Sequence, residues 1–251
     1  MPERLGLNWL FMSKISEKKP PVICIDGPSA SGKGEISRRI AKNLGYHLLD
    51  SGMLYRILAL EVDRREIDLL DKKALTDFVM KLKIEFVERN GRANAINVNG
   101  KDVSLDIRTD KVSKYSSKIA AIPAVREALL KRQIVFRKPP GLVADGRDMG
   151  SVVFPDAEIK IFLTASPAAR AERRYKQLIG KGIRVKLSSV LDELIERDAR
   201  DQNRAISPLV ISETSIVIDS TQLSVEQVSM EVMNVIMSKK ITHGKVGQRI
   251  T

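Results

Sequence analysis

Short apolar runs alternate with helical patterns along most of the chain, beginning near Pro21. Behind the first run, Ile36, Ile40 and Leu44 fall on one face of a helix. Strands that alternate with helices predict an α/β fold, with a parallel five-stranded sheet flanked by helices. The runs with the composition of buried strands are Val22–Ile25, His47–Asp50, Gly141–Asp145, Ile159–Leu163 and Ser215–Asp219.

One segment departs from this alternation. Ile84–Gly91 alternates apolar and polar residues and ends in an Asn-Gly pair, and Ala95–Gly100 repeats that arrangement. Asn-Gly pairs between period-two runs are typical of tight hairpin turns. We therefore expect a small antiparallel β domain, inserted in the core at about residues 78–118. The core then comprises residues 21–77, 119–165 and 205–239.

The two ends of the chain carry no comparable pattern. We expect a disordered lead-in over residues 1–20 and a frayed tail over residues 240–251. Before that tail, Ser224 and Gln227 have the spacing of a capping box. This spacing predicts the start of the last helix, because each side chain can bond the other residue's backbone amide.

The charge of the chain favours an anionic ligand. Its net charge is +12, from 43 Lys and Arg against 31 Asp and Glu, and a basic balance attracts polyanions. Nucleic-acid binders usually combine a basic stripe with stacking aromatics, but aromatics are only 4% here and the arginines lie beside acids. We therefore expect phosphate-handling rather than nucleic-acid binding, with general solubility as the alternative.

The content of cysteine and histidine and the hydropathy of the chain bear on disulfides, metal binding and cellular location. Cys24 is the one cysteine, so no internal disulfide can form, which suits the reducing cytoplasm. Two histidines and one cysteine make a transition-metal site improbable. No apolar run approaches the roughly 20 residues that span a bilayer, and no segment resembles a secretory signal. We expect a cytoplasmic protein without a membrane partner, and a monomer.

A phosphate-binding motif follows the first predicted strand. Gly27, Gly32 and Lys33 match G-x-x-x-x-G-K. The glycines let successive backbone N–H groups point at one anion, the following helix adds its positive end, and the lysine reaches the outer phosphates. The position between a strand and a helix makes an ordinary Gly-rich turn a poor explanation. The expected ATP-binding residues are Gly27, Pro28, Ser29, Ala30, Ser31, Gly32, Lys33, Gly34 and Glu35.

Four further blocks make a resemblance specific, namely Asp50–Arg56, Ile122–Leu130, Ala144–Asp156 and Glu196–Arg204. With the phosphate loop they resemble bacterial cytidylate kinases, which are P-loop nucleoside-monophosphate kinases, from about Val22 to Ile236. The resemblance implies a P-loop kinase core and transfer of the terminal phosphoryl group of ATP to cytidine or deoxycytidine monophosphate. It also implies Mg²⁺ as cofactor and a place in pyrimidine nucleotide metabolism.

The resemblance assigns roles residue by residue. Ser117, Arg126 and Asp148 match positions that read cytosine, and Arg56 and Arg147 match phosphate ligands. The chemistry agrees, because a carboxylate accepts from the exocyclic amine while an arginine and a hydroxyl serve the ring acceptors. A surface charge is the alternative for Arg126, and a polar turn for Asp148. The full set implied at the monophosphate is Ser51, Tyr55, Arg56, Ser117, Arg126, Arg147, Asp148, Arg197, Asp201 and Arg204.

Arginines also cluster in two predicted helical segments, which we interpret as a lid over residues 166–204. Arg197, Arg200, Asp201 and Arg204 have the spacing of one helix face, with Asp201 matching a ligand of the sugar hydroxyls. Converging arginines repel one another unless an anion offsets them, although a solvated Arg197–Asp201 pair is the alternative. We expect closure of this lid to exclude water.

The second cluster, Arg170, Arg173 and Arg174, lies on a helix that Ser166-Pro167 begins as N-cap and first residue. We expect at least one of these arginines to touch the migrating phosphoryl group, and surface charge is the alternative for the others. Asp145 ends a strand in the manner of a metal-organising carboxylate. The residues expected to carry catalysis are Lys33, Arg147, Arg174 and Asp145.

Glu35 departs from the family, where Gly-Lys-Gly is typically followed by threonine. Its carboxylate suits a helix N-terminus, and it either points outward or approaches Mg²⁺ directly or through water. We expect the outward or water-mediated arrangement. Two other readings of the whole chain stay open: a P-loop kinase for another acceptor such as uridylate or shikimate, and an ATP-switched protein that binds RNA or ribosomes.

Overall fold

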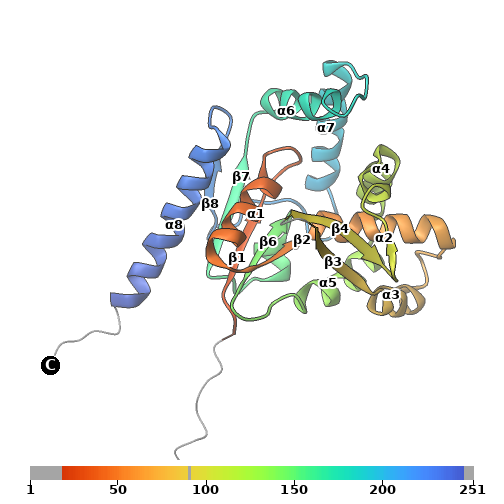
Figure 1. Cartoon of the computed structure of the whole chain (residues 1–251), viewed down its shortest axis with the longest axis horizontal. Helices are drawn as coiled ribbons and strands as arrows, with labels where there is room; N and C mark the ends of the chain where they lie inside the picture. The colour runs from red at the N-terminus through yellow and green to blue at the C-terminus, as the bar shows by residue number, and fades with distance from the viewer. Residues whose placement is uncertain (1–18, 90–91, 246–251) are drawn as a thin grey trace, which may run out of the picture.

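The computed structural model describes residues 19–89 and 92–245 and is built around one parallel sheet (Figure 1). Its strand order is β2-β6-β1-β7-β8, and every neighbouring pair is parallel. The α/β fold with a five-stranded parallel sheet is thereby confirmed. The strands are β1 (Val22–Asp26), β2 (His47–Asp50), β6 (Leu142–Gly146), β7 (Ile159–Thr164) and β8 (Ile216–Asp219).

Helices cover both faces of this sheet, and the central strand β1 supplies both cores. Ile23 and Ile25 pack in one cluster with α1 and α8, whereas Val22 and Cys24 pack in the other with α2 and α5. Successive side chains of a strand point to opposite faces, so a strand buried on both sides reads as a continuous apolar run. The covering helices are α1 (Lys33–Leu44), α2 (Ser51–Arg65), α5 (Pro123–Ile134) and α8 (Val225–Lys245).

The predicted antiparallel sheet lies between α3 (Lys72–Lys81) and α4 (Asp110–Ile119), with the short 3₁₀ turn η1 (Asp106–Arg108) before α4. Its strands have the order β3-β4-β5. The second Asn-Gly turn is confirmed, because Asn99 and Gly100 have φ of 51° and 81°. The first, at residues 90–91, lies outside the described residues. The strands are β3 (Ile84–Arg89), β4 (Arg92–Val98) and β5 (Lys101–Asp102).

Two helices, α6 (Pro167–Ile179) and α7 (Leu187–Gln202), occupy the segment interpreted as a lid. They pack together around Ala171, Leu178, Val190 and Leu194. Figure 1 shows the pair standing above the carboxyl ends of the parallel strands, with α4 beside it. The predicted N-cap is confirmed, since the Ser166 hydroxyl accepts from the Ala169 amide at 3.2 Å.

The two ends of the last helix differ in outcome. At its start the capping box is confirmed, because the Ser224 amide donates to Gln227 Oε1 at 2.8 Å and the Gln227 amide to Ser224 Oγ at 3.2 Å. At its end we expected a frayed tail from residue 240, but α8 continues to Lys245. Residues 1–18 and 246–251 lie outside the described residues. Within the described part of the chain, no helix is long and apolar enough to cross a membrane.

Candidate active site

The phosphate loop connects β1 to α1 in a conformation that only its glycines permit. Gly27 has a φ of 149°, and an added Cβ would lie 2.1 Å from the carbonyl oxygen of Leu163 on β7. Gly32 has a φ of 98° directly before the helix. Glycine adopts these angles at no steric cost, whereas other residues are strained there. The motif therefore forms a tight backbone curl at the N-terminus of α1, where an anion is favoured.

Lys33 is the first residue of α1, and its side chain is buried. Its ammonium donates to the carbonyl oxygen of Pro28 at 2.8 Å, so the lysine folds back over the loop. Burial and then the charge of Arg147 lower the pKa of Lys33, while Asp145 opposes them. Burial in turn raises the pKa of Asp145 at the end of β6. Arriving phosphates would raise the pKa of Lys33 again, because an anion favours the protonated form.

Glu35 lies on the exposed side of α1. Its carboxylate accepts from Arg38 NH1 at 2.6 Å and from Arg39 Nε at 2.9 Å, and Arg39 also pairs with Glu226 on α8. Of the two arrangements considered from the sequence, the structure has the outward one. Glu35 thus belongs to an ion-pair network on the helix surface.

We expect Glu35→Thr to change turnover by no more than roughly tenfold, equivalent to about 1.4 kcal/mol. Removing the exposed network should cause only a small fall in thermal midpoint, because surface ion pairs stabilise little. Steady-state rates at several Mg²⁺ concentrations measure this. Loss of most activity together with a shifted Mg²⁺ dependence would show instead that the carboxylate reaches the metal.

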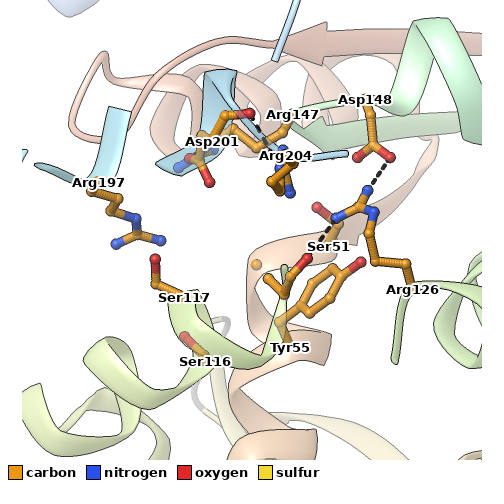
Figure 2. A pocket seen from close by; sticks show the side chains of 12 residues that line it. Ser51, Tyr55, Ser116, Ser117, Arg126, Arg147, Asp148, Arg197, Asp201 and Arg204 are labelled. Carbon is orange, nitrogen blue, oxygen red and sulfur yellow. Dashed lines mark hydrogen bonds and ion pairs between the residues drawn. The ribbon is translucent and has the colours of Figure 1, made fainter. Parts of the chain in front are cut away.

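A pocket lies between α2, α4, α5, the segment after β6, and the carboxyl end of α7 (Figure 2). Of the ten residues assigned to the monophosphate from the sequence, nine line it, and Arg56 does not. Gly52, Ser116 and Ala120 line it as well, and sequence reasoning missed them although Gly52 and Ser116 adjoin assigned residues. The lining residues are Ser51, Gly52, Tyr55, Ser116, Ser117, Ala120, Arg126, Arg147, Asp148, Arg197, Asp201 and Arg204.

One side of the pocket is built on a buried ion pair between Arg126 and Asp148. Arg126 NH1 donates to the carbonyl oxygen of Ala120 at 3.2 Å, and its guanidinium lies 5.8 Å from the ring centre of Tyr55. Arg126 Nε and the hydroxyl of Ser117, which also lines the pocket, are two of the buried polar atoms that have no partner within the described residues. The surface-charge explanation for Arg126 is therefore wrong. Buried polar atoms left open beside a cavity indicate a ligand that would satisfy them.

The other side of the pocket is basic. Arg147 Nε donates to Asp201 Oδ2 at 2.9 Å, and its NH2 donates to Ser29 Oγ in the phosphate loop at 3.0 Å. Burial and then the charge of Arg147 lower the pKa of Arg197 to about 9. Within the described chain Arg197 Nε and Arg204 NH2 have no partner. Arginines held this close together would bind an anion that offsets their repulsion.

The expected helix face of arginines needs two corrections. The helix α7 ends at Gln202, so Arg204 reaches the pocket from the segment that follows and not from the helix. Arg200 is exposed and is not among the lining residues. The expected alternative of an Arg197–Asp201 ion pair is also wrong, because Asp201 pairs with Arg147.

The three arginines of α6 separate into two kinds. Arg170 donates to the carbonyl oxygens of Ala165 and Ser29, and pairs with Asp198 on α7 at 2.7 Å. Arg173 donates to Ser220 and to the carbonyl of Ser31. Both arginines therefore donate to backbone carbonyl groups of the phosphate loop.

Arg174 is the third, and it is half-buried. Its NH2 lies 3.8 Å from Asp110 on α4, which is long for a charged pair. Burial lowers the pKa values of Arg56 and Arg197, and the charge of Arg174 adds to this effect. Arg197 lines the basic side of the pocket. Of the three, Arg174 is the one placed to meet phosphate, and this role stays a prediction.

Comparison with known proteins identifies relatives along almost the whole described chain. Residues 23–238 match the sequence profile of the family described as cytidylate kinase. The cytidylate kinase of Pseudomonas fluorescens is 51% identical over 89% of this chain and 98% of its own length. The cytidylate kinase of Yersinia enterocolitica is 51% identical over 83% of this chain and 90% of its own length. That of Aeromonas salmonicida is 50% identical over 85% of this chain and 92% of its own length.

Proposed function

The chain belongs to the cytidylate kinase family, and we propose that it phosphorylates cytidine and deoxycytidine monophosphate with ATP through the pocket described above. The observation that carries the proposal is the Arg126–Asp148 pair, which is buried yet leaves Arg126 Nε without a partner in the described residues, as is the Ser117 hydroxyl across the pocket (Figure 2). Cytosine presents an exocyclic amine next to ring acceptors. A pocket lined by a carboxylate, an arginine and a hydroxyl offers both the acceptor and the donors that this edge requires.

The basic side of the pocket suits the phosphate of the acceptor. Arg147, Arg197 and Arg204 line it, and nitrogens of Arg197 and Arg204 that have no partner in residues 19–89 and 92–245 remain available. Asp201 contributes the one carboxylate on this side, which fits a role on the sugar hydroxyls once nucleotide is bound. Arg147 also touches Ser29, so the acceptor side lies directly against the phosphate loop.

The reaction follows from that adjacency. An oxygen of the acceptor phosphate attacks the terminal phosphorus of ATP in line, the bond from that phosphorus to the bridging oxygen breaks, and ADP leaves. The protein needs little covalent chemistry for this step, since positioning and positive charge supply most of the catalysis. Lys33 would neutralise charge on the ATP side, while Arg174 and the pocket arginines would do so around the transferred group.

Mg²⁺ accompanies ATP in such enzymes, and the residues present fit it. Asp145 lies next to the loop, with its Oδ2 3.3 Å from the position that a Cβ on Gly34 would occupy. In phosphoryl-transfer sites the ion is held by one or two carboxylates, waters and substrate phosphates. No group of three or more His, Cys, Asp or Glu side chains in the described residues could hold a metal by itself. Asp145 would hold the ion, whose charge offsets that of the phosphates.

A panel of nucleoside monophosphates tests the proposed acceptor. We expect CMP and dCMP to be turned over and UMP to be poorer by about 1–3 kcal/mol in kcat/KM, roughly 5- to 150-fold. Uracil has a carbonyl where cytosine has the amine, so the Asp148 carboxylate, which keeps its bond from Arg126, would gain no donor from the base. ADP release in a coupled assay, with ATP alone as the control, measures this.

Three results would contradict the assignment. Equal use of CMP and UMP would show that Asp148 does not read the base. Turnover of shikimate instead of a nucleotide would show that the acceptor is not a nucleoside monophosphate. Monophosphate-independent ATP hydrolysis together with salt-sensitive RNA binding would favour the reading as an ATP-switched RNA-binding protein.

A further inference from the structure

Asp26 is a buried carboxylate to which the proposed chemistry assigns no role. It is the last residue of the central strand β1, and it pairs with Gly146 at the end of β6. No ion pair holds it within residues 19–89 and 92–245. Its two oxygens instead accept one backbone amide each: Oδ1 from Met149 at 2.9 Å and Oδ2 from Gly150 at 2.8 Å.

These amides begin the turn that directly follows Arg147 and Asp148. The turn is a short π-helix, η2 (Met149–Val153), and the first amides of any helix lack partners inside it. Farther along, the amides of Val152 and Val153 close the turn on the carbonyl oxygen of Asp148, at 2.9 and 3.1 Å. Asp26, at the end of β1, therefore caps the N-terminus of this helix.

The turn has little freedom besides these bonds. An added Cβ on Gly150 would lie 3.1 Å from Lys160 Cγ and 3.4 Å from Cys24 Cβ, so the backbone lies directly against β1 and β7. An added Cβ on Gly146 would lie 2.7 Å from Ser51 Oγ, a residue that lines the pocket. A shift of the turn would therefore change the pocket itself.

The charge state of Asp26 agrees with this geometry. Burial raises its pKa to about 6, while the amide hydrogen bonds from Gly150 and Met149 and the charge of Lys33 lower it. An ionised carboxylate has no donor of its own and can accept from both amides at once, as the two hydrogen bonds require. Hydrogen bonds to an ionised acceptor are roughly twice as strong as neutral ones.

We infer that Asp26 is a positioning residue for monophosphate recognition, which holds the backbone after Asp148 so that the Asp148 carboxylate and the Arg147 guanidinium face the acceptor nucleotide. The inference rests on the proposed function. Asp26 is in neither the pocket lining nor the phosphate loop, so it acts through the turn and not by touching nucleotide.

Asp26→Asn tests the inference in the full-length chain. The asparagine side chain keeps one oxygen that can accept from a backbone amide, but its NH₂ group replaces the second oxygen. That NH₂ group and the second backbone N–H are both donors, so one hydrogen bond is lost and the turn shifts. We expect KM for CMP to rise roughly tenfold, the factor that about 1.4 kcal/mol represents. The preference for CMP over UMP should fall, while KM for ATP stays unchanged. Initial rates with each substrate varied at saturating partner measure all three.

The matched control is Ile25→Val, which lightens the neighbouring buried position of β1 without touching the turn. It should lower the thermal midpoint and leave both KM values and the base preference unchanged. If Asp26→Asn does not fold, Asp26→Glu replaces it, because it keeps both oxygens but displaces them by one methylene; KM for CMP should again rise selectively.

Equal rises in KM for CMP and ATP, or the same kinetic changes in Ile25→Val, would overturn the inference and leave Asp26 a purely structural residue. So would an unaltered KM for CMP in a folded Asp26 variant. These failures differ from failure of the proposed function, which would appear in the unaltered protein as absence of CMP phosphorylation.

Discussion

Lys33→Ala is expected to lower turnover by roughly 10²- to 10³-fold, the usual effect of removing one preorganised donor from a developing negative charge. Lys33 is buried at the start of α1 and contacts the loop through Pro28, but it does not line the monophosphate pocket. Affinity for CMP should therefore stay nearly intact. Coupled ADP release gives turnover, and calorimetric titration gives CMP affinity.

The control for this change is Lys42→Ala, because Lys42 lies on the same helix but is exposed. It should retain turnover and CMP affinity. The reciprocal variant is Arg147→Ala, which should weaken CMP binding as well as turnover, since Arg147 lines the pocket and pairs with Asp201. If instead Lys33→Ala abolished CMP affinity and Arg147→Ala left it intact, the donor and acceptor sides would be reversed.

The centre of the parallel core could be predicted from the sequence because its strands β6, β1 and β7 are buried on both faces. Such strands are short apolar runs, and the glycines and lysine of the phosphate loop mark the junction between β1 and α1. The Asn99-Gly100 turn was equally readable, because a tight turn with positive φ selects those two residue types.

The helix α4 could not be found in the same way. Its buried residues include Ser113, Ser116 and Ser117 beside Val112 and Ile119, so hydrophobic periodicity records only part of its buried face. The serines are buried because α4 packs against α2 and two of them line the pocket. The serines that line the pocket thus weaken the hydrophobic pattern by which α4 would be recognised in the sequence.

The pairing of charged side chains could not be predicted from the sequence either. Arg147 and Asp201 are 54 positions apart, and local spacing suggested a partner for Asp201 on its own helix. The fold brings α7 over the end of β6, where the partly buried guanidinium of Arg147 pairs with Asp201. Burial likewise separates Arg126, which faces the pocket, from the surface charges that its helical spacing equally permitted.

Asp148→Asn should change which base the enzyme accepts. The asparagine oxygen can still accept from Arg126, but the other half of the side chain becomes a donor. Facing cytosine, that donor meets the exocyclic amine; facing uracil, it meets a carbonyl that accepts it. Loss of a hydrogen bond to a charged group costs about 1.5–3 kcal/mol. We therefore expect the ratio of kcat/KM for CMP to that for UMP to fall by about a hundredfold.

The change also removes the counter-charge of buried Arg126, and breaking such a pair typically destabilises by about 3–5 kcal/mol. Rates must therefore be measured below the lowered thermal midpoint, with circular dichroism confirming the fold. Asp156→Asn is the matched control, because it makes the same chemical change at an Asp–Arg pair with Arg137 whose carboxylate is exposed. It should leave the CMP to UMP ratio unaltered. If Asp148→Asn lowered kcat/KM for both nucleotides equally, the carboxylate would support Arg126 without reading the base.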